Sequence, residues 1–265
     1  DNDNHCQSVT SVSVTKDVAT PVISIFNVEQ IDCTTQTQTI SVTYTITNAM
    51  GVSYQWSAND SGNSTMTTSD GGIYSVTVTD NDNHCEKVAS ISVTKDVAQP
   101  KVKIYDVKQI DCATQTQSIS VTQTLTNKMG VTYSWSTGDG NQSSITVTEG
   151  GTYSVTVTDN DNHCESVATV SVEKDVDVPT ISIPAVEQID CTTQTQTISV
   201  MHTVTNVAGV TYKWSANDTG LSSIVVTNAG IYSVTVVDDD NHCQEVATVS
   251  VTQDIAQPKV RILDV

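Results

Sequence analysis

The sequence is poor in basic and aromatic residues and has no long apolar run. Of its 265 residues, 11 are Lys or Arg and 30 are Asp or Glu, which gives a formal net charge of −19. This charge argues against nucleic-acid binding, because a phosphate backbone attracts basic surfaces. No apolar run approaches the roughly 20 residues of a membrane span, so no span is expected in this segment. Aromatic residues make up only 5% and hydrophobic residues 37%, and this composition favours an acidic, β-rich chain.

Motifs that mark common catalytic sites are absent as well. The sequence has no Gly-x-Ser-x-Gly elbow, no His-Glu-x-x-His pair and no phosphate-binding loop. His does recur, but within a polar phrase that is repeated along the chain, where a solvated loop is the commoner explanation. We therefore do not expect an enzyme.

The cysteines reveal a tandem repeat of 79 residues. Two cysteine series keep this spacing, one at Cys6, Cys85, Cys164 and Cys243 and the other at Cys33, Cys112 and Cys191. A strict period of this length indicates an array of similar domains. The period predicts a strand of a preceding repeat at 1–17, three repeats at 18–96, 97–175 and 176–254, and the first strand of a following repeat at 255–265.

The apolar pattern within a repeat has a period of two. Ile40, Val42, Tyr44 and Ile46 alternate with Ser and Thr, which is typical of strands and not of helices. The first repeat contains strand patterns at Val22–Phe26, Thr39–Thr47, Val52–Ser57, Ser64–Thr68, Ile73–Thr79 and Val88–Lys95. We assign five of them, in chain order, as strands A, B, C, F and G, and expect the stretch between C and F, which includes Ser64–Thr68, to hold both D and E. About six or seven short strands in one repeat predict a two-sheet sandwich.

Two aromatic positions favour an immunoglobulin-like arrangement of that sandwich. A single Trp lies in the third strand of each repeat, and a Tyr lies near the start of strand F, after a tight turn. These positions correspond to the core Trp and the tyrosine corner of the immunoglobulin fold. The predicted structural core therefore includes Trp56, Trp135, Trp214, Tyr74, Tyr153 and Tyr232. The fold class we expect is all-β, with tandem immunoglobulin-like domains in an extended array.

One longer phrase supports a family resemblance. Tyr133–Gly138, Ser144–Val147 and Gly151–Asp159, closed by Cys164, resemble the repeats of giant surface adhesins of the SprB gliding-motility type in Bacteroidetes. The resemblance implies a secreted cell-surface protein, exported by the type IX route. The phrase Asp-Asn-Asp-Asn-His-Cys departs from the shorter Asn-Gly-Cys turn of such repeats. No signal peptide is visible, so targeting segments are expected outside this sequence or removed from it.

The joints between repeats have no flexible linker. Strand G runs through Lys95–Pro100 into strand A of the next repeat without a Gly/Ser stretch, so consecutive domains should be semi-rigid. Cys33 follows strand A and Cys85 follows strand F, which places them at opposite ends of one repeat, more than about 20 Å apart. A disulfide needs Cα atoms within about 7 Å. We therefore expect inter-domain disulfides at the joints, Cys33 with Cys164 and Cys112 with Cys243.

Other pairings stay open. An intradomain bond would form if strand A were shorter or displaced, and links between neighbouring chains or free thiols are further alternatives. Every disulfide version indicates an oxidising, extracellular setting. Zinc is weakly supported, because each His-Cys pair consists of adjacent residues that seldom point to one metal.

The same joints gather acidic residues from several loops. Hard oxygen ligands suit Ca²⁺, so a calcium ion at each joint is one hypothesis, with turn formation by Asp and Asn as the alternative. The candidate ligands are Asp32, Asp96, Asp159 and Asp161 at one joint and Asp111, Asp175, Asp238 and Asp240 at the next.

Two functions remain. In the first, the repeats form a stalk or filament on a cell surface, built from neighbouring repeats of one chain or also from identical chains side by side. In the second, each repeat binds surface polysaccharide or another cell, with multivalent gain in affinity. The residues of strand B differ between repeats, at the equivalent segments Thr43–Ile46, Thr122–Leu125 and Met201–Val204. The Asp and Pro residues of the joints are the same in every repeat. A binding face should have the same residues in each repeat, so this pattern favours the structural function.

Overall fold

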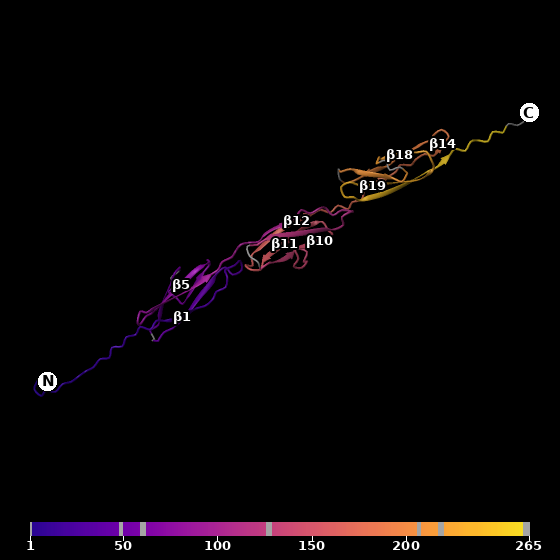
Figure 1. The fold of residues 1–265 in the computed structure, drawn as a ribbon. Coiled ribbons are helices and arrows are strands. Elements are labelled where there is room, and N and C mark those ends of the chain that lie inside the picture. The colour runs from indigo at the N-terminus through magenta and orange to yellow at the C-terminus, as the bar shows by residue number, and fades with distance from the viewer. Residues whose placement is uncertain are drawn as a thin grey trace, which may run out of the picture. The chain divides into compact units, whose positions relative to one another are not determined.

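The structure is a computed structural model that describes residues 2–47, 50–58, 62–125, 129–205, 208–216 and 220–261. The secondary structure of the described residues consists of strands alone (Figure 1). Among these residues there is no helix of the length and apolar character that a membrane crossing requires. The all-β class predicted from the sequence is therefore confirmed.

The described part of the first repeat, residues 18–96, contains six strands in two sheets. One sheet has the order β1-β2-β4 and the other has the order β3-β5-β6. Neighbouring strands within each sheet pair antiparallel. The strands are β1 (Val22–Ile25), β2 (Gln38–Thr45), β3 (Val52–Trp56), β4 (Thr65–Thr68), β5 (Gly72–Asp80) and β6 (Glu86–Val93).

The other two repeats have equivalent strands. Residues 97–175 contain β7 (Lys101–Ile104), β8 (Gln117–Thr124), β9 (Val131–Trp135), β10 (Ser144–Val147), β11 (Gly151–Asp159) and β12 (Glu165–Val172). Residues 176–254 contain β13 (Thr180–Ser182), β14 (Ile189–Asp190), β15 (Gln196–Ser199), β16 (Met201–Thr203), β17 (Val210–Trp214), β18 (Ser223–Val226), β19 (Gly230–Asp238), β20 (Gln244–Val251) and β21 (Gln253–Asp254). Their sheets are β10-β8-β7 and β12-β11-β9 in the second repeat, and β13-β16, β15-β18, β17-β19-β20 and β14-β21 in the third.

This pairing order is the A-B-E and C-F-G order of an immunoglobulin-like sandwich. One expectation differs: the described residues between β3 and β5 contain a single strand, β4, which pairs with β2 and is therefore strand E. No strand D occurs in the described part of that stretch. Gly62 lies there with a φ of 64°, a left-handed conformation that suits a turn and interrupts extended backbone.

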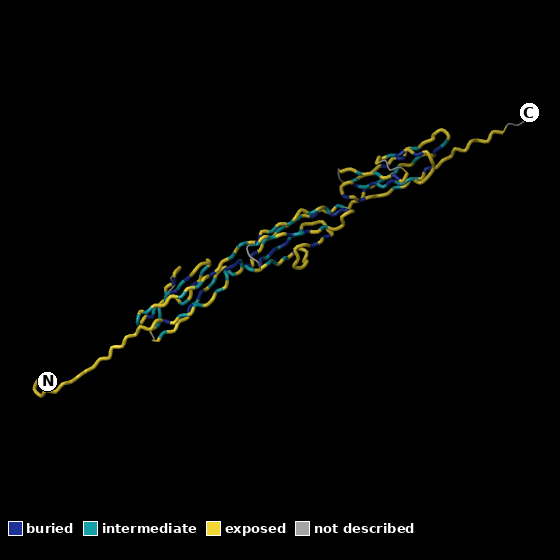
Figure 2. Tube along the Cα trace, viewed as in Figure 1, coloured by how far each residue is buried: buried dark blue, intermediate teal, exposed yellow. Residues whose placement is uncertain are grey.

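Alternation of apolar and polar residues explains why these segments pair as strands. Along β5, Tyr74, Val76 and Val78 are buried, whereas Ser75 and Thr77 between them are more exposed, because successive side chains point to opposite faces of a sheet. Figure 2 shows the same alternation of buried and more exposed residues along the other strands. The buried side chains form one core cluster within residues 31–93 and an equivalent cluster within 189–251.

Each repeat places its Trp in the core and its Tyr at a corner. Trp56, Trp135 and Trp214 are each at most 4% exposed, and each indole Nε1–H donates to a backbone carbonyl seven residues further on. The hydroxyl groups of Tyr74, Tyr153 and Tyr232 donate to the carbonyl four residues upstream, at 2.7 to 2.8 Å. This contact is the tyrosine corner that the sequence predicted.

The buried Trp gives a direct test of the core. Replacing Trp56 with Ala is expected to cost about 3–5 kcal/mol of unfolding free energy, because a large cavity remains. Trp56→Phe should cost less, since it keeps most of the apolar volume and loses the hydrogen bond to the Asn63 carbonyl. Urea denaturation measures both changes, and an Ala variant within about 1 kcal/mol of the wild type would contradict this packing.

The chain divides into two compact units whose limits differ from those of the repeats. Unit 1 comprises Asp1–Lys101, Thr124–Thr132 and Val157–Ser166, and unit 2 comprises Val102–Gln123, Tyr133–Thr156 and Val167–Val265. The turn between β11 and β12 thus belongs to unit 1, the unit that contains the first repeat. The predicted limits at 18–96, 97–175 and 176–254 stay a prediction from the sequence period.

The outer segments carry no strand pairing in the described residues. Residues 2–4 form a turn, residues 5–21 and 255–261 belong to no strand, and 262–265 lie outside the described residues. Val9, Val12 and Val14 are nearly fully exposed. In the first repeat the equivalent residues form β6, which pairs with β5.

Strand directions place the two cysteine positions of one repeat at opposite ends. Ile31, which follows β1, forms a parallel bridge with Lys95, which follows β6. Because β5 runs antiparallel to β6, the turn that holds Cys85 lies at the other end of β6. Eight residues of strand span about 26 Å, which is far beyond the Cα separation of a disulfide. A bond between Cys33 and Cys85 within one repeat is incompatible with this fold.

Candidate functional site: the joints between repeats

Two disulfides tie successive repeats together. In unit 1 Cys33 is bonded to Cys164, with Cα atoms 5.1 Å apart, and in unit 2 Cys112 is bonded to Cys243, with Cα atoms 5.0 Å apart. Both bonds join cysteines 131 residues apart. These are the two inter-domain pairs expected from the sequence. We call the surroundings of the first bond joint 1 and those of the second joint 2.

Each joint consists of a loop and a turn. We call Ile31–Thr35, Ile110–Thr114 and Ile189–Thr193 the acceptor loops, because each follows the first strand of its repeat and carries the first cysteine. We call Asp80–Cys85, Asp159–Cys164 and Asp238–Cys243 the docking turns, because each closes the hairpin that corresponds to β5–β6. A joint forms where the docking turn of one repeat meets the acceptor loop of the repeat before it.

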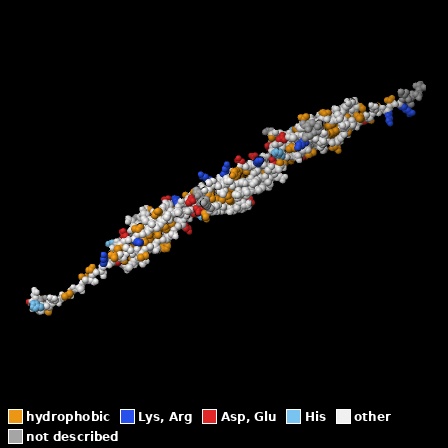
Figure 3. Space-filling view, viewed as in Figure 1, with side chains coloured by type: hydrophobic (Ala, Val, Ile, Leu, Met, Phe, Trp, Pro, Cys, Tyr) orange, Lys and Arg blue, Asp and Glu red, His pale blue; other side chains and the backbone are white. Residues whose placement is uncertain are grey.

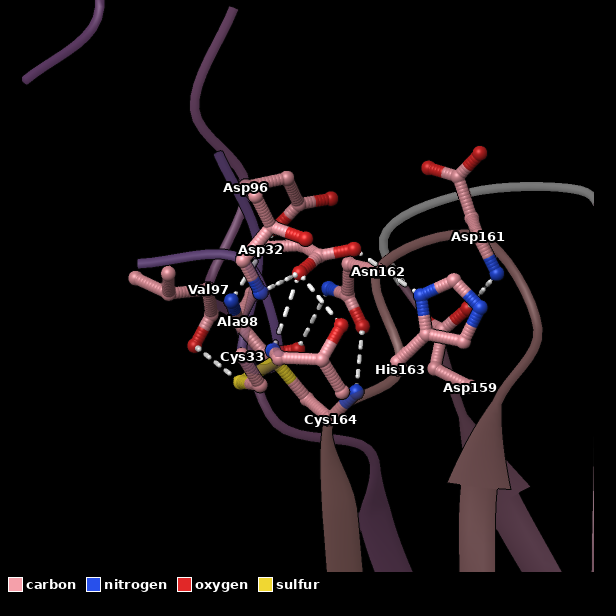
Figure 4. Close-up of a disulfide and its surroundings, with 12 residues drawn as sticks. Asp32, Cys33, Asp96, Val97, Ala98, Asp159, Asp161, Asn162, His163 and Cys164 are labelled. Carbon is pink, nitrogen blue, oxygen red and sulfur yellow. Dashed lines mark hydrogen bonds and ion pairs between the residues drawn. A yellow bond between two sulfur atoms is a disulfide. The ribbon is translucent and has the colours of Figure 1, made fainter. Parts of the chain in front are cut away.

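In joint 1 the docking turn is held by polar contacts on both sides of the disulfide (Figure 4). The Cys33 amide donates to the Asn162 carbonyl at 3.1 Å. The Asn162 Nδ2 donates to the Ala98 carbonyl at 2.9 Å, in the segment that links the two repeats. The ring Nδ1 of His163 donates to Asp32 Oδ2 at 2.9 Å. Asn162 and Cys164 are completely buried as a result.

Joint 2 repeats these contacts in unit 2. The Cys112 amide donates to the Asn241 carbonyl at 3.0 Å, and the Asn241 Nδ2 donates to the Asp177 carbonyl at 2.9 Å. His242 Nδ1 lies 3.0 Å from Asp111 Oδ2. One contact is particular to this joint, because Asn241 also donates to the Asp175 carboxylate at 2.9 Å. The joint is therefore a reproduced arrangement and not an accident of one position.

Local sequence explains the shape of the docking turn. His163 adopts a φ of 55°, and the other turn histidines lie between 57° and 58°, in the left-handed region that non-Gly residues seldom occupy. The His163 amide donates to the Asp159 carbonyl at 2.9 Å, and the Cys164 amide donates to the Asn162 side chain at 3.0 Å. Such Asx bonds stabilise turns. They direct the imidazole and the sulfur toward the neighbouring repeat.

The acceptor loop is fixed from both sides. The Ile31 amide donates to the Thr94 carbonyl and its carbonyl accepts from the Asp96 amide, both at 2.9 Å. Ile31 itself is 1% exposed and belongs to the core. The Asp32 carboxylate then accepts from the amides of Thr34 and Thr35 and from the Thr34 hydroxyl. Cys33 is thus presented from a rigid loop.

The two buried aspartates have lowered pKa values. Burial raises the pKa of the Asp32 carboxyl and is the largest single influence, but hydrogen bonds from the Thr35 amide, His163 and Thr34 outweigh it and hold the pKa well below its ordinary value. For Asp111, burial is likewise opposed by the Thr114 amide, by His242 and by the Ala113 amide, and the pKa is lowered. Asp32 and Asp111 are 7% and 8% exposed, so their charges are little screened by solvent.

These lowered pKa values predict acid sensitivity of the joints. A carboxyl whose pKa is lower in the folded than in the unfolded chain stabilises the fold above about pH 4, and this stabilisation is lost as the pH falls toward the folded pKa. The variant Asp32→Asn/Asp111→Asn should therefore melt at a lower temperature than the wild type at pH 6. This difference should shrink below pH 4.

Thermal melting as a function of pH measures the effect. Asp106→Asn is the control, because Asp106 is exposed and no contact at a joint involves it. A difference between the double variant and the wild type that stays constant from pH 6 to pH 2 would contradict the role of the two carboxylates.

The acidic residues proposed as calcium ligands are mostly engaged in their own turns. The Asp159 and Asp238 carboxylates accept the amide two residues on, and Asp96 and Asp175 do the same. In Figure 4 Asp161 points away from the disulfide, on the far side of the His163 ring from Asp32. Among the described residues, no three or more His, Cys, Asp or Glu side chains form a group that could hold a metal ion. Calcium at the joints stays a prediction of the sequence.

A shallow groove lies beside each acceptor loop. The grooves enclose about 350 Å³ next to Cys33, about 490 Å³ next to Cys112 and about 500 Å³ next to Cys191. Equivalent Ile, Asp, Cys and Gln residues line all three. On the face shown in Figure 3, charged side chains are scattered and neutral polar surface dominates. The groove is thus a repeated feature of the array, with the same residue types at equivalent positions.

Sequence reasoning missed three partners in each joint. It named Asp32 as a metal ligand, whereas the structure pairs Asp32 with His163, and it gave no role to Asn162 or to Thr35. The strict repetition of Asn-His-Cys at four positions was the available signal. A polar turn that only met solvent would be free to vary.

Comparisons with family models and with curated proteins found no match. Among solved structures, the chain is similar to the immunoglobulin domains 1–5 of Sidekick-1, with 10% identity and a TM-score of 0.33 over 88% of this chain and 57% of that one. It is also similar to domains 1–6 of the surface layer protein SbsC, with 13% identity and a TM-score of 0.30 over 92% and 41% of the two chains. A third similar structure is the BSP domain of a biofilm associated protein, with 15% identity and a TM-score of 0.23 over 72% of this chain and 44% of that one. The chain thus spans about half the length of these structures.

Proposed function

We propose that this chain is a load-bearing segment of an extracellular surface filament or adhesin stalk, without catalytic activity. The observation that carries the proposal is the pair of disulfides that each tie one repeat to the next through the same set of hydrogen bonds. Disulfides persist in oxidising compartments, which supports an extracellular location. The resemblance to SprB-type repeats supports attachment to a bacterial surface and a part in gliding motility.

The spacing of the disulfides suits a mechanical role. Each bond closes a loop of 131 residues, which is longer than the 79-residue period. The two loops therefore overlap between Cys112 and Cys164. Because of this overlap, every peptide bond from Cys33 to Cys243 is bypassed by at least one disulfide. A chain built in this way keeps covalent continuity even where its backbone is broken.

Cleavage at one site tests the proposal. With a specific protease site inserted after Asn141, a single cut should leave one covalent molecule on a non-reducing gel and two fragments after reduction. The same site inserted after Ala256 is the control, because it lies beyond the last joined cysteine, and its cut should release a fragment with or without reductant. Separation of the Asn141 fragments without reductant would overturn the proposal.

Calcium would add a second source of stiffness at the joints. The acidic residues around joints 1 and 2 support it, since hard oxygen donors are the ligands Ca²⁺ takes. A melting temperature that rises with calcium relative to a chelator would support this addition. An equal melting temperature would remove calcium and leave the disulfide joints in place.

Recognition of surface glycans is the second candidate function. The groove that recurs beside each acceptor loop favours it, because repeated weak sites gain affinity through multivalency. A glycan array probed with the whole chain distinguishes the two functions. A clear positive that is lost on changing groove residues such as Gln36 and Gln115 would favour adhesion over a purely structural role.

A further inference from the structure

The two cysteines of each joint disulfide differ in exposure. Cys164 and Cys243, in the docking turns, are 0% exposed, whereas Cys33 is half-buried and Cys112 is exposed. We propose that Cys33 and Cys112 are thiol-exchange sites, at which a small aminothiol opens the joint disulfide and is held as a mixed disulfide until the bond reseals. The inference deepens the proposed function and rests on it.

The groove beside each acceptor loop leads to the more accessible cysteine. Cys33 lines the groove of about 350 Å³ and Cys112 lines the groove of about 490 Å³, and such volumes lie in the range of sites for small molecules. Val97 lines the first groove as well, and its carbonyl oxygen lies 4.0 Å from the Cys33 sulfur (Figure 4). A small molecule in either groove is therefore next to one sulfur of the disulfide.

The geometry of thiol exchange selects the sulfur that is attacked. A thiolate approaches a disulfide along the S–S axis, on the side opposite the leaving sulfur, and access to that side controls the rate. Attack on Cys164 would need an approach from within the docking turn, where Asn162 is also 0% exposed. Attack on Cys33 needs an approach from the acceptor loop, where the groove lies. Cys33 therefore receives the incoming thiol and Cys164 leaves.

The exchange is balanced in atoms and electrons. The thiolate of the small molecule attacks the Cys33 sulfur, so that a new S–S bond forms and the bond to Cys164 breaks. Cys164 leaves as a thiolate and takes up, through water, the proton that the small thiol lost. In the reverse step the Cys164 thiolate attacks the Cys33 sulfur and the small thiolate leaves. The cycle consumes no oxidant and no reductant.

Hydrogen bonds hold the joint together while the disulfide is open. The Cys33 amide donates to the Asn162 carbonyl, Asn162 donates to the Ala98 carbonyl, and His163 donates to Asp32. These contacts do not involve the sulfur atoms, so they keep the leaving thiol beside the mixed disulfide. Resealing is then an intramolecular step with a high effective concentration. Joint 2 has the equivalent contacts.

The charges around the grooves favour a thiol that carries a cation. Asp32 and Asp111 line the two grooves. The Lys of the first groove, Lys95, is already paired with Asp70 at 3.0 Å, and the Lys of the second groove is paired in the same way. An attacking thiolate is itself an anion, so an ammonium group on the same molecule offsets its repulsion from the carboxylates. The expected class is therefore small aminothiols, such as cysteamine.

Mapping of the adducts tests the assignment. The cysteines outside the joint disulfides are first replaced, as Cys6→Ser, Cys85→Ser and Cys191→Ser. Excess cysteamine is added to the oxidised chain, the exchange is stopped early with acid, and the free thiols are alkylated before peptide mapping without reductant. Cysteamine should be found on Cys33 and Cys112, and the alkyl group on Cys164 and Cys243. Cysteamine mainly on Cys164 and Cys243, equally on both cysteines of a bond, or on none of them would overturn the inference.

A bulky side chain in one groove tests the route of entry. Ser69 is exposed and lines the groove beside Cys33, so Ser69→Trp should slow the opening of the Cys33–Cys164 bond by about tenfold, because access controls the rate. Ser69→Ala leaves the groove open and should match the unsubstituted chain. The Cys112–Cys243 bond is the internal control, and its rate should not change. Equal slowing of both bonds, or of neither, would contradict entry through the groove.

A comparison of two small thiols tests the aminothiol class. At low salt and equal thiolate concentration, cysteamine should open the joints several-fold faster than 2-mercaptoethanesulfonate, which carries a further negative charge in place of the ammonium group. Added salt should reduce the difference, because it screens the charges. Equal rates for the two thiols at low salt would overturn the aminothiol class.

A peptide map made before any thiol is added separates this inference from the proposed function. If that map shows Cys33–Cys164 and Cys112–Cys243 but cysteamine later attaches to the docking-turn cysteines, the inference fails and the proposed function stands. If the two bonds are absent from the first map, the proposed function fails with it.

Discussion

Pulled by its two ends, the oxidised chain should reach less than half the length of the reduced chain. With both disulfides intact, force follows residues 1–33, then 112–164 in reverse, and then 243–265, because each disulfide provides a shortcut. This path of about 110 residues spans about 370 Å when fully extended, at about 3.4 Å per residue. The reduced chain of 265 residues spans about 900 Å.

Single-molecule force spectroscopy measures this length. The control is a chain in which Cys33 and Cys112 are replaced by Ser, which should extend to the longer value with or without reductant. An oxidised wild-type chain that also extends to about 900 Å would show that the joints are not closed by these disulfides.

Loss of one joint disulfide should remove a large part of the stability of the chain. Closing a loop of 131 residues lowers the entropy of the unfolded chain by the equivalent of about 5 kcal/mol on the chain-entropy relation. The variant Cys33→Ser/Cys164→Ser removes the bond without leaving a stray thiol. Urea denaturation should therefore show a loss of a few kcal/mol, together with a lower midpoint.

The matched control replaces two cysteines that form no disulfide in the structure. Cys85→Ser/Cys191→Ser, measured at low protein concentration, should change the unfolding free energy by less than about 0.5 kcal/mol. If the two double variants were equally stable, the disulfide of joint 1 would contribute nothing to folding.

The fold was predictable because its determinants are local and repeated. Alternating residues such as Ile40 and Val42 predict strands, and the recurring Trp and Tyr positions identify the sandwich. The predicted strand limits differ from the observed ones by at most two residues, as in β1, which ends at Ile25, and in β6, which begins at Glu86 and ends at Val93. Strand D was expected from the fold type and not from a pattern, and the described residues of that stretch do not contain it.

The joint was predictable only in part, for a physical reason. The disulfide pairs followed from strand directions and the limit on Cα separation, which need no side-chain detail. The pair formed by Asp32 and His163 joins residues 131 positions apart, and no local pattern connects them. The acidic residues suggested a shared ion, whereas most of them accept amides of their own turns, as Asp96 and Asp159 do.

Peptide mapping under non-reducing conditions tests the central claim most directly. The oxidised chain is alkylated to block free thiols, digested, and analysed by mass spectrometry before and after reduction. The account predicts two cross-linked peptides, one joining Cys33 to Cys164 and the other joining Cys112 to Cys243. Peptides that join Cys33 to Cys85 or Cys112 to Cys164, or alkylated thiols at all four joint cysteines, would contradict it.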